Sequence, residues 1–325
     1  MRFVTSVYGQ RHVNMLLPLL SSIEDSNPTA QVSVYWEEID AATISLLSHT
    51  FPRVEFVETN FRFGADITRR ISSKTTTWEF AALRHVNELV CFLDADMLVV
   101  RSLAELFSGR SFDILITDKS GQFPINSGVV VAQMSPVVLE FFRQWNKQTK
   151  AVLDSKELSK QANSRLKPYG GADQMALQQL IGYTYGISKY KTVLGSESVR
   201  VESIDCRYMN ETESRPITKQ THIIHYKGGW RSILFEGGYF TKNRSKHGSW
   251  PMFIMYLTTF RRAVSKVNHA TQKNYSMGDF GLHIPFYINP TTFRERQGQY
   301  MLFFLVAWTR ALPKRIYGFV RARLS

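Results

Sequence analysis

The sequence predicts an α/β protein: a mostly parallel central sheet with flanking helices, followed by a basic helical C-terminal extension. Three observations support this prediction. Short β-rich runs alternate with helical runs of roughly 10–15 residues from the N-terminus onward. A wholly apolar run, "LVCFL" at 89–93, suits the centre of a parallel sheet, which is buried on both faces. Beyond residue 240 the alternation stops, and the composition becomes basic and aromatic.

The alternation can be followed element by element. The β-rich runs are "FVTSVYG" (3–9), "AQVSVYWEE" (30–38) and "RVEFVE" (53–58). The helical runs are "HVNMLLPLLSSIEDS" (12–26), where Pro18 disturbs the apolar spacing, "AATISLLSHTF" (41–51) and "WEFAALRHVNE" (78–88). Strands joined by helices of this length form right-handed crossovers, which give a parallel sheet. Ser102 and Glu105 have the spacing of a capping box, so a further helix is predicted to begin at "SLAEL" (102–106).

The charge is unevenly distributed along the 325 residues. An apolar content of 44% is enough for a substantial core. From Thr241 to Ser325 the chain has 14 lysines and arginines against two acids, Asp279 and Glu295, which accounts for +12 of the net charge of +13. We therefore predict a nearly neutral domain at 1–240 and a basic, aromatic-rich region at 241–325.

Cysteine usage and the N-terminal residues predict a cytosolic protein. Cys91 and Cys206 are too few for a disulfide framework, which favours a reducing compartment. The start, "MRFVTSVYGQRH", lacks the long apolar segment of a secretory signal or membrane anchor. The tripeptides at Asn210, Asn243 and Asn274 match a glycosylation acceptor pattern. Without an export signal we interpret them as chance matches.

Two carboxylates interrupt the apolar run "VCFLDADMLVV" at 90–100. Burying an unpaired carboxylate is costly, so Asp94 and Asp96 need compensation from basic side chains, backbone donors or a divalent cation. In an extended backbone, residues i and i+2 point the same way, so both can bind one Mn²⁺ or Mg²⁺. The alternative is a turn in which the acids cap the following helix. Ligands of open α/β sheets bind at the carboxyl ends of strands, which is where this pair lies.

Four segments, in this order, carry a resemblance to a known family: "FLDADMLV" (92–99), "PINSGVVVAQ" (124–133), "GGADQMALQQLI" (170–181) and "THIIHYKGGWR" (221–231). Over roughly residues 1–235 the sequence resembles the metal-dependent glycosyltransferases of the GT-A fold. Within them it is most similar to the retaining group that includes glycogenin and bacterial lipooligosaccharide galactosyltransferases. The resemblance implies a Rossmann-like core, a nucleotide-sugar donor, commonly a UDP-hexose, and Mn²⁺ or Mg²⁺ as cofactor.

The resemblance assigns a metal site. Asp94 and Asp96, with Ala95 between them, match the Asp-x-Asp motif that holds the cation against the donor diphosphate. His225 matches the histidine that supplies a third protein ligand after the last core strand. A histidine at a strand end can also be structural, which is the alternative for His225.

The resemblance also assigns residues near the donor sugar. Asn126 and Ser127 match the loop that contacts the sugar, and the alternative is an Asn-Ser-Gly turn before the strand "VVVAQ". Asp173 and Gln174 match the Asp-Gln pair beside the anomeric carbon. Their alternative is N-capping of the helix "QMALQQLI", and Asp173 can serve both purposes.

Further residues match contacts to the nucleotide and its phosphates. Tyr8 ends the first strand, where its ring can stack on the base or belong to the core. Lys74 and Arg70 lie upstream of the carboxylates, where a cation meets the donor in the family, and the alternative is a solvated basic face. Lys227 or Arg231 can stabilise the departing diphosphate. Arg231 stands where the family often has lysine, so the sequence leaves both open.

The expected reaction is transfer of a sugar to a saccharide or lipid-linked glycan acceptor. No second carboxylate is evident as a base, which favours retention, with the leaving phosphate oxygen taking the acceptor's proton. One alternative is a sugar nucleotidyltransferase, although "VYGQRHVN" (7–14) has a single glycine where those enzymes have a glycine-rich loop. Another is a non-catalytic basic protein that binds nucleic acid or serves as a membrane scaffold. We do not expect nucleic acid as a partner.

The basic C-terminal region predicts association with an anionic membrane. Within residues 299–324 the apolar run "MLFFLVAW" (301–308) is far short of the roughly 20 residues that span a bilayer. Its aromatic residues and the arginines after it suit a segment lying in the membrane interface, and residues 249–266 have similar character. The alternative is a C-terminal helix packed on the catalytic domain. We thus expect a cytoplasmic enzyme, peripheral on the inner face of a membrane.

Overall fold

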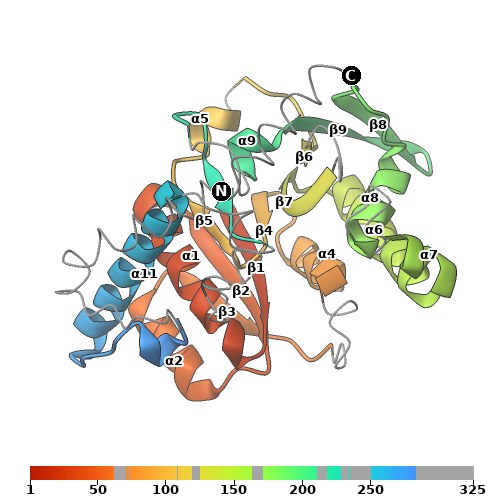
Figure 1. Ribbon diagram of the computed structural model, residues 1–325. Helices are drawn as coiled ribbons and strands as arrows, with labels where there is room; N and C mark the ends of the chain where they lie inside the picture. The colour runs from red at the N-terminus through yellow and green to blue at the C-terminus, as the bar shows by residue number, and fades with distance from the viewer. Residues whose placement is uncertain are drawn as a thin grey trace, which may run out of the picture.

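The molecule is a central eight-stranded sheet with helices on both faces, plus a two-stranded ribbon (Figure 1). The computed structural model describes residues 1–61, 71–72, 74–107, 109–118, 125–162, 171–210, 218–227, 234 and 250–282. The strand order in the large sheet is β3-β2-β1-β4-β7-β6-β9-β8. The predicted α/β class is confirmed.

The N-terminal half is the predicted parallel alternation. It consists of β1 (Arg2–Tyr8), α1 (Val13–Ser26), β2 (Gln31–Glu37), α2 (Ala41–Thr50), β3 (Val54–Glu58), α4 (Lys74–Arg84) and β4 (Leu89–Leu93). A short 3₁₀ turn, η1 (Gln10–His12), joins β1 to α1. Strands β3, β2, β1 and β4 pair in parallel. Pro18 lies inside α1, which continues through it to Ser26.

The second half adds antiparallel strands to the sheet. Its elements are β6 (Ile114–Asp118), β7 (Ile125–Gln133), α6 (Pro136–Asp154), α7 (Lys156–Ala162), α8 (Ala172–Ile181), β8 (Lys189–Leu194), β9 (Glu197–Asp205) and α9 (Cys206–Met209). Strand β7 is antiparallel to both β4 and β6, whereas β9 is parallel to β6. Because β7 runs against β4, the first residues of β7 lie beside the end of β4.

The ribbon joins residues far apart in the sequence. Strand β5 (Met97–Val99) pairs antiparallel with β10 (Ile223–His225), and His225 is in register with Met97. This pairing brings the end of β10 to the segment that follows β4. The one-turn helix α5 (Ala104–Phe107) begins near the predicted Ser102, whose Oγ accepts from Ala104 N at 3.3 Å.

Strand β4 contributes to two cores, one on each face of the sheet. Cys91 and Leu93 belong to the core under α1 and α2. The neighbouring Phe92 belongs to the core under α4, α6 and α8, where its ring lies 4.7 Å from that of Phe142. Burial on both faces explains why this strand has no polar residue. Both cysteines of the chain are free and buried, and burial raises the pKa of the Cys91 thiol.

The first helix of the basic region, α11 (Trp250–Thr271), packs on α1. Tyr256, Phe260 and Val267 are buried in the same core as α1. On the polar side, Lys266 Nζ lies 2.6 Å from Glu24 Oε2 of α1. These buried side chains are covered by the protein itself, so they cannot form the membrane contact that the similar character of residues 249–266 suggested.

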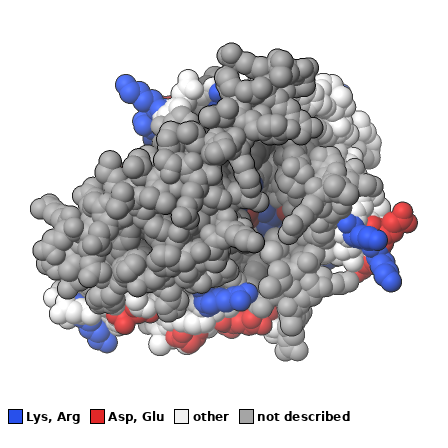
Figure 2. Space-filling model, viewed as in Figure 1, with Lys and Arg blue, Asp and Glu red and all other residues white. Residues whose placement is uncertain are grey.

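The remaining C-terminal predictions fall on residues 299–324, outside the described residues. In the part of the chain that the structure describes, no helix combines the length and apolar character that a membrane crossing requires. On the face in Figure 2, basic and acidic residues lie next to one another along the lower edge.

We expect Phe260→Ala to lower the free energy of unfolding by about 3–5 kcal/mol, because it leaves a cavity in the core between α11 and α1. Thr258 on the same helix is exposed, so Thr258→Ala is the matched control and should change stability by less than about 0.5 kcal/mol. Denaturant unfolding measures both. Equal stability of the two variants would contradict the packing of α11 in the core.

Candidate metal-binding and catalytic site

Asp94, Ala95 and Asp96 form the connection between β4 and β5. Asp94 N donates to Gly128 O of β7 at 2.9 Å, which fixes the turn to the neighbouring strand. Asp96 is buried and Asp94 is half-buried. The sequence argument assumed an extended backbone here, whereas the structure has a bend. Ala95 is half-buried and packs against the core.

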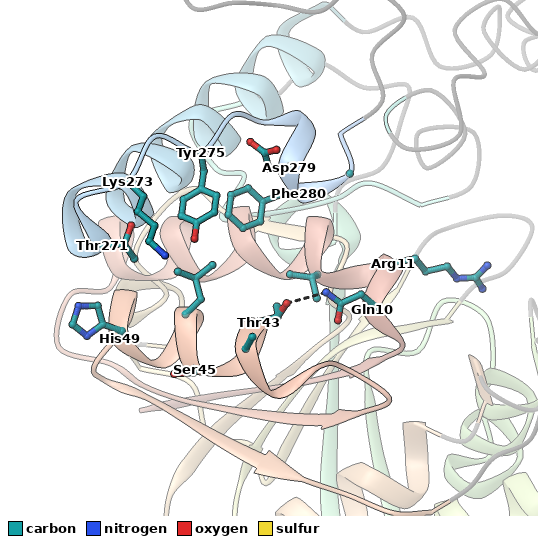
Figure 3. A pocket seen from close by; sticks show the side chains of 14 residues that line it. Gln10, Arg11, Thr43, Ser45, His49, Thr271, Lys273, Tyr275, Asp279 and Phe280 are labelled. Atoms are coloured by element: carbon teal, nitrogen blue, oxygen red, sulfur yellow. Dashed lines mark hydrogen bonds between the residues drawn. The ribbon is translucent and has the colours of Figure 1, made fainter.

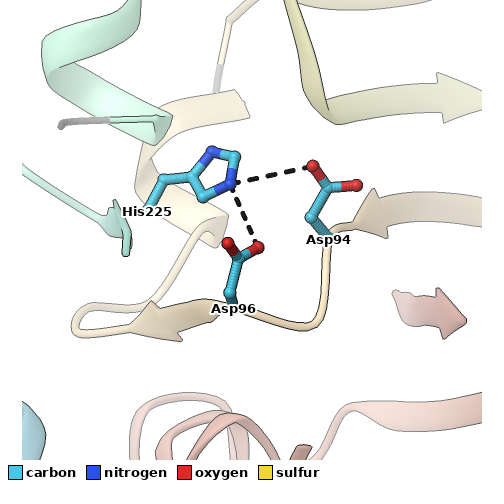
Figure 4. Close-up of side chains that lie close together, drawn as sticks. All are labelled: Asp94, Asp96 and His225. Atoms are coloured by element: carbon cyan, nitrogen blue, oxygen red, sulfur yellow. Dashed lines mark hydrogen bonds and ion pairs between the residues drawn. The ribbon is translucent and has the colours of Figure 1, made fainter. Parts of the chain in front are cut away.

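The two carboxylates converge on His225, the last residue of β10 (Figure 4). His225 Nε2 lies 3.1 Å from Asp96 Oδ1 and 3.7 Å from Asp94 Oδ2. The other ring nitrogen, Nδ1, lies 2.8 Å from Asn210 Oδ1. Burial lowers the pKa of His225, although the charge of Asp96 acts in the opposite direction.

A glycine makes room for the imidazole. A Cβ at Gly128 would lie 2.7 Å from His225 Cε1 and 2.9 Å from His225 Nδ1, closer than real Cβ contacts come. Gly128 is therefore required by the approach of the His225 ring to β7. The glycine of the "PINSGVVVAQ" segment thus has a packing role next to His225.

The donor set fits a divalent cation. One ligand atom from each of Asp94, Asp96 and His225 lies within 4.8 Å of the others. Two carboxylates and one imidazole are ligands that Mn²⁺ accepts, and Mg²⁺ is held by carboxylates together with substrate phosphates. Burial disfavours the protonated, positively charged form of His225, so this histidine does little to balance the two carboxylates. A bound cation would offset their negative charge. The alternative in which the acids cap the following helix is wrong, because α5 begins only at Ala104.

Lys74, at the start of α4, connects the cluster of Asp94, Asp96 and His225 to a third carboxylate. Its Nζ lies 2.9 Å from Asp94 Oδ1, 3.1 Å from Ser127 O and 3.4 Å from Asp173 Oδ2. Burial works to lower the pKa of Lys74, but the charges of Asp94 and Asp173 raise it above its ordinary value. The alternative of a solvated basic face is wrong for this lysine, because its side chain is only 8% exposed.

Asp173 lies in the first turn of α8, buried and facing the same cluster. Its Oδ2 accepts from Ser127 Oγ, and its Oδ1 accepts from Ser72 Oγ at 3.4 Å. The N-cap residue of α8 is Gly171, so Asp173 is inside the helix and does not cap it. The N-capping alternative is therefore wrong. Gln174 is half-buried in the same turn.

Asn126 and Ser127 are buried in strand β7 itself, and are neither a loop nor a turn. Ser127 joins the two halves of the site, because its carbonyl accepts from Lys74 and its hydroxyl donates to Asp173. Asn126 Oδ1 accepts from Gly128 N at 2.9 Å, two residues along its own strand. Their contact with a donor sugar stays a prediction.

Tyr8 ends β1, as the sequence predicted, and is half-buried. Its hydroxyl forms a hydrogen bond with Thr77 Oγ1 of α4, and burial raises the pKa of Tyr8 to about 12. Lys227, also half-buried, is close enough to His225 for its charge to lower the pKa of that histidine. Arg231 and Arg70 lie outside the described residues.

Sequence reasoning missed Asn210, which contacts the proposed metal ligand His225. Asn210 drew attention only through its glycosylation-type tripeptide, and the structure shows its side chain fully buried. Burial agrees with a chance match to that pattern. Nothing local in the sequence points to its contact with His225.

A separate cavity of about 700 Å³ lies between α2 and the residues that end and follow α11 (Figure 3). Thr43, Ser45 and His49 line one wall, and Lys273, Tyr275 and Phe280 line the other. Its lining includes none of Asp94, Asp96 and His225. The candidate site therefore rests on the side-chain cluster and not on this cavity.

Comparisons with known proteins identify the fold. No family model and no curated protein sequence matches the chain. Among solved structures, the glycosyltransferase GlyE of Streptococcus pneumoniae TIGR4 superposes with a TM-score of 0.51 at 12% identity, covering 84% of this chain and 65% of GlyE. The galactosyltransferase LgtC, solved with donor and acceptor sugar analogues, gives 0.49 at 14% identity, covering 84% of this chain and 98% of LgtC.

The bifunctional glycosyltransferase WbbM gives a TM-score of 0.46 at 12% identity over 80% of this chain and 51% of its own. This chain thus spans less than two thirds of GlyE and about half of WbbM. The superposition on GlyE, at 12% identity, shows the fold and leaves the activity to be argued from the site. The protein has the GT-A fold that the sequence resemblance predicted.

Proposed function

We propose that the protein is a glycosyltransferase that moves a sugar from a nucleotide-diphosphate sugar to a saccharide or lipid-linked glycan acceptor. One observation supports this most directly. The cluster of Asp94, Asp96 and His225 is joined through Lys74 to the buried Asp173 at the carboxyl end of β4. This arrangement supports the proposal that the donor's phosphates bind at the Asp94, Asp96 and His225 cluster and that its sugar lies next to Asp173.

The reaction breaks the bond between the anomeric carbon and a phosphate oxygen. Negative charge grows on the leaving diphosphate, and positive charge grows on the sugar ring. A divalent cation, when bound by Asp94, Asp96 and His225, supplies positive charge opposite the diphosphate. We assign Lys227, which is half-buried near His225, to contact the same phosphates. Arg231 is the second candidate for this contact.

We assign the sugar side of the reaction to Asp173. Its carboxylate is held by Ser127 and faces Lys74, so its position is fixed before any substrate arrives. There it can stabilise the positive sugar ring, electrostatically or as a transient nucleophile, with Gln174 beside it. Because Asp94 is assigned to the cation, we invoke no other carboxylate as a general base for the acceptor. The acceptor's proton then goes to the leaving phosphate oxygen, and the configuration is retained.

The finer proposal is a UDP-hexose donor with Mn²⁺ as the preferred cation. Asn126 and Ser127 are proposed to contact the sugar, and Tyr8 and Ala95 the nucleotide. The alternative, a nucleotidyltransferase, would need several backbone N–H donors around a triphosphate, usually in a glycine-rich loop. Here the connection between β1 and α1 contains one glycine, Gly9. A screen of the purified protein with Mn²⁺ against a panel of nucleotide sugars, with nucleotide release as readout, separates these activities from a non-catalytic binding protein.

We expect Asp94→Ala and Asp96→Ala each to lower turnover in that screen by more than about 100-fold, because each removes a proposed ligand of the cation. Neither carboxylate packs a core, so circular dichroism should be unchanged. Glu197 is exposed on β9, and Glu197→Ala should retain full activity as the matched control. Undiminished activity of both aspartate variants, or of the native enzyme in excess chelator, would end the metal proposal.

Asp173→Asn should lower kcat by about 100-fold or more, because the amide keeps the shape but loses the charge that stabilises the transition state. Donor affinity should change little. Equilibrium binding of a non-transferable donor analogue, compared with kcat, separates the two effects. A loss confined to donor binding would show that Asp173 only holds the ground state.

Peripheral attachment to an anionic membrane through residues 299–324 is a further part of the proposal. Replacing Arg310, Lys314, Arg315, Arg321 and Arg323 by glutamine in the full-length protein should abolish co-sedimentation with vesicles containing anionic lipid. Each cation near such a surface contributes about 1 kcal/mol. Native protein that fails to sediment with anionic vesicles, or a variant that sediments equally well, would rule out this attachment.

A further inference from the structure

The Asn210 side chain is buried between the proposed metal ligand and two strands of the large sheet. It follows α9, has no exposed surface, and each of its polar atoms has a partner. Its Oδ1 lies 2.8 Å from His225 Nδ1. Its Nδ2 donates to Thr117 Oγ1 at 2.9 Å and to Asn126 O at 3.3 Å.

These partners fix which way round the amide lies. Asn126 O is a carbonyl oxygen and can only accept, so the amide nitrogen must face it. Thr117 Oγ1 donates its own hydrogen to the same carbonyl at 3.0 Å, so it must accept from Asn210. A flipped amide would place its oxygen against both. The oxygen of Asn210 therefore faces His225.

The orientation of the amide determines the proton on the imidazole. Because Asn210 Oδ1 can only accept, His225 Nδ1 must carry a hydrogen. In the neutral ring the lone pair then belongs to Nε2, the nitrogen that lies 3.1 Å from Asp96 Oδ1. This is the nitrogen that faces the carboxylates (Figure 4). The ring is thus set to offer Nε2 to a cation.

We infer that Asn210 is a positioning residue that holds His225 in the metal-binding tautomer and ring orientation. This inference rests on the metal role in the proposed function. The same amide is tied to Asn126 O on β7, so it also fixes the distance between His225 and the strand that carries Ser127. Loss of such an outer partner typically weakens metal binding about 10–100-fold.

The experiment measures Mn²⁺ binding without any nucleotide sugar, from the electron paramagnetic resonance signal of the free ion. Asn210→Leu removes the acceptor for His225 Nδ1 at similar volume and should raise the Kd for Mn²⁺ about 10–100-fold. Thr117→Val is the matched control, since it removes a buried partner of Asn210 but spares the bond to His225. It should bind Mn²⁺ with native affinity.

Asn210→Asp tests the same point with a conservative change. It keeps an acceptor for Nδ1 while losing the donor to Asn126 O, and should bind Mn²⁺ more tightly than Asn210→Leu. Native affinity in a folded Asn210→Leu variant, or equal losses in Thr117→Val and Asn210→Leu, would overturn the inference.

A measurement on the native protein covers the case in which the variants do not fold. Long-range ¹H–¹⁵N spectra of the histidine rings, with His225 assigned by comparison with His225→Gln, should show Nδ1 protonated in the metal-free protein. An unprotonated Nδ1 would overturn the inference. Neither readout involves sugar transfer, so a protein that passes both tests yet releases no nucleotide would refute the proposed function alone.

Discussion

Burial of negative charge at the end of β4 is the constraint on which the site depends. Asp96 and Asp173 are almost inaccessible to water and Asp94 is half-buried, so their charges must be balanced locally. Lys74 lies between Asp94 and Asp173, and His225 lies against Asp96. Among the residues that the structure describes, Lys74 alone does not balance these three carboxylates, and burial opposes the protonation of His225. A divalent cation at the proposed metal site would supply the missing positive charge, and would then contribute to the stability of this region as well as to its chemistry.

The reversal of the sheet at β7 is what assembles these groups. The parallel half, β3-β2-β1-β4, ends with Asp94 at its carboxyl edge. Because β7 runs against β4, its first residues reach the same edge, and Ser127 can hold both Lys74 and Asp173 there. The ribbon of β5 and β10 adds His225 from a distant part of the sequence. Strand pairing thus brings Ser127 and His225 to the connection that carries Asp94 and Asp96, and helices α4 and α8 add Lys74 and Asp173.

Features that follow from the local pattern of apolar residues could be predicted from the sequence. Features that depend on contacts with residues distant in the sequence could not. The unbroken apolar run of β4 predicts that the strand is buried on both faces. Its successive residues Cys91 and Phe92 indeed enter different cores. Helix α11 has apolar and cationic faces that suit a membrane surface equally well, and only its packing against α1 decides between them. From the sequence alone, Lys74 could likewise be a surface cation, because its carboxylate partners Asp94 and Asp173 are distant in the sequence.

Residues that position other residues are the hardest to find by sequence reasoning, because their partners are remote. Asn210 bonds to His225, 15 residues away, and to Thr117, 93 residues away. Its neighbours along the chain give a glycosylation-type tripeptide, which describes an exposed asparagine, whereas here the side chain is fully buried. Asp173 shows the same effect in reverse, since a helix-start position suggested capping and the tertiary contacts instead direct it toward Lys74. A polar residue whose local interpretation is contradicted by its burial is therefore a good place to look for a role in the chemistry.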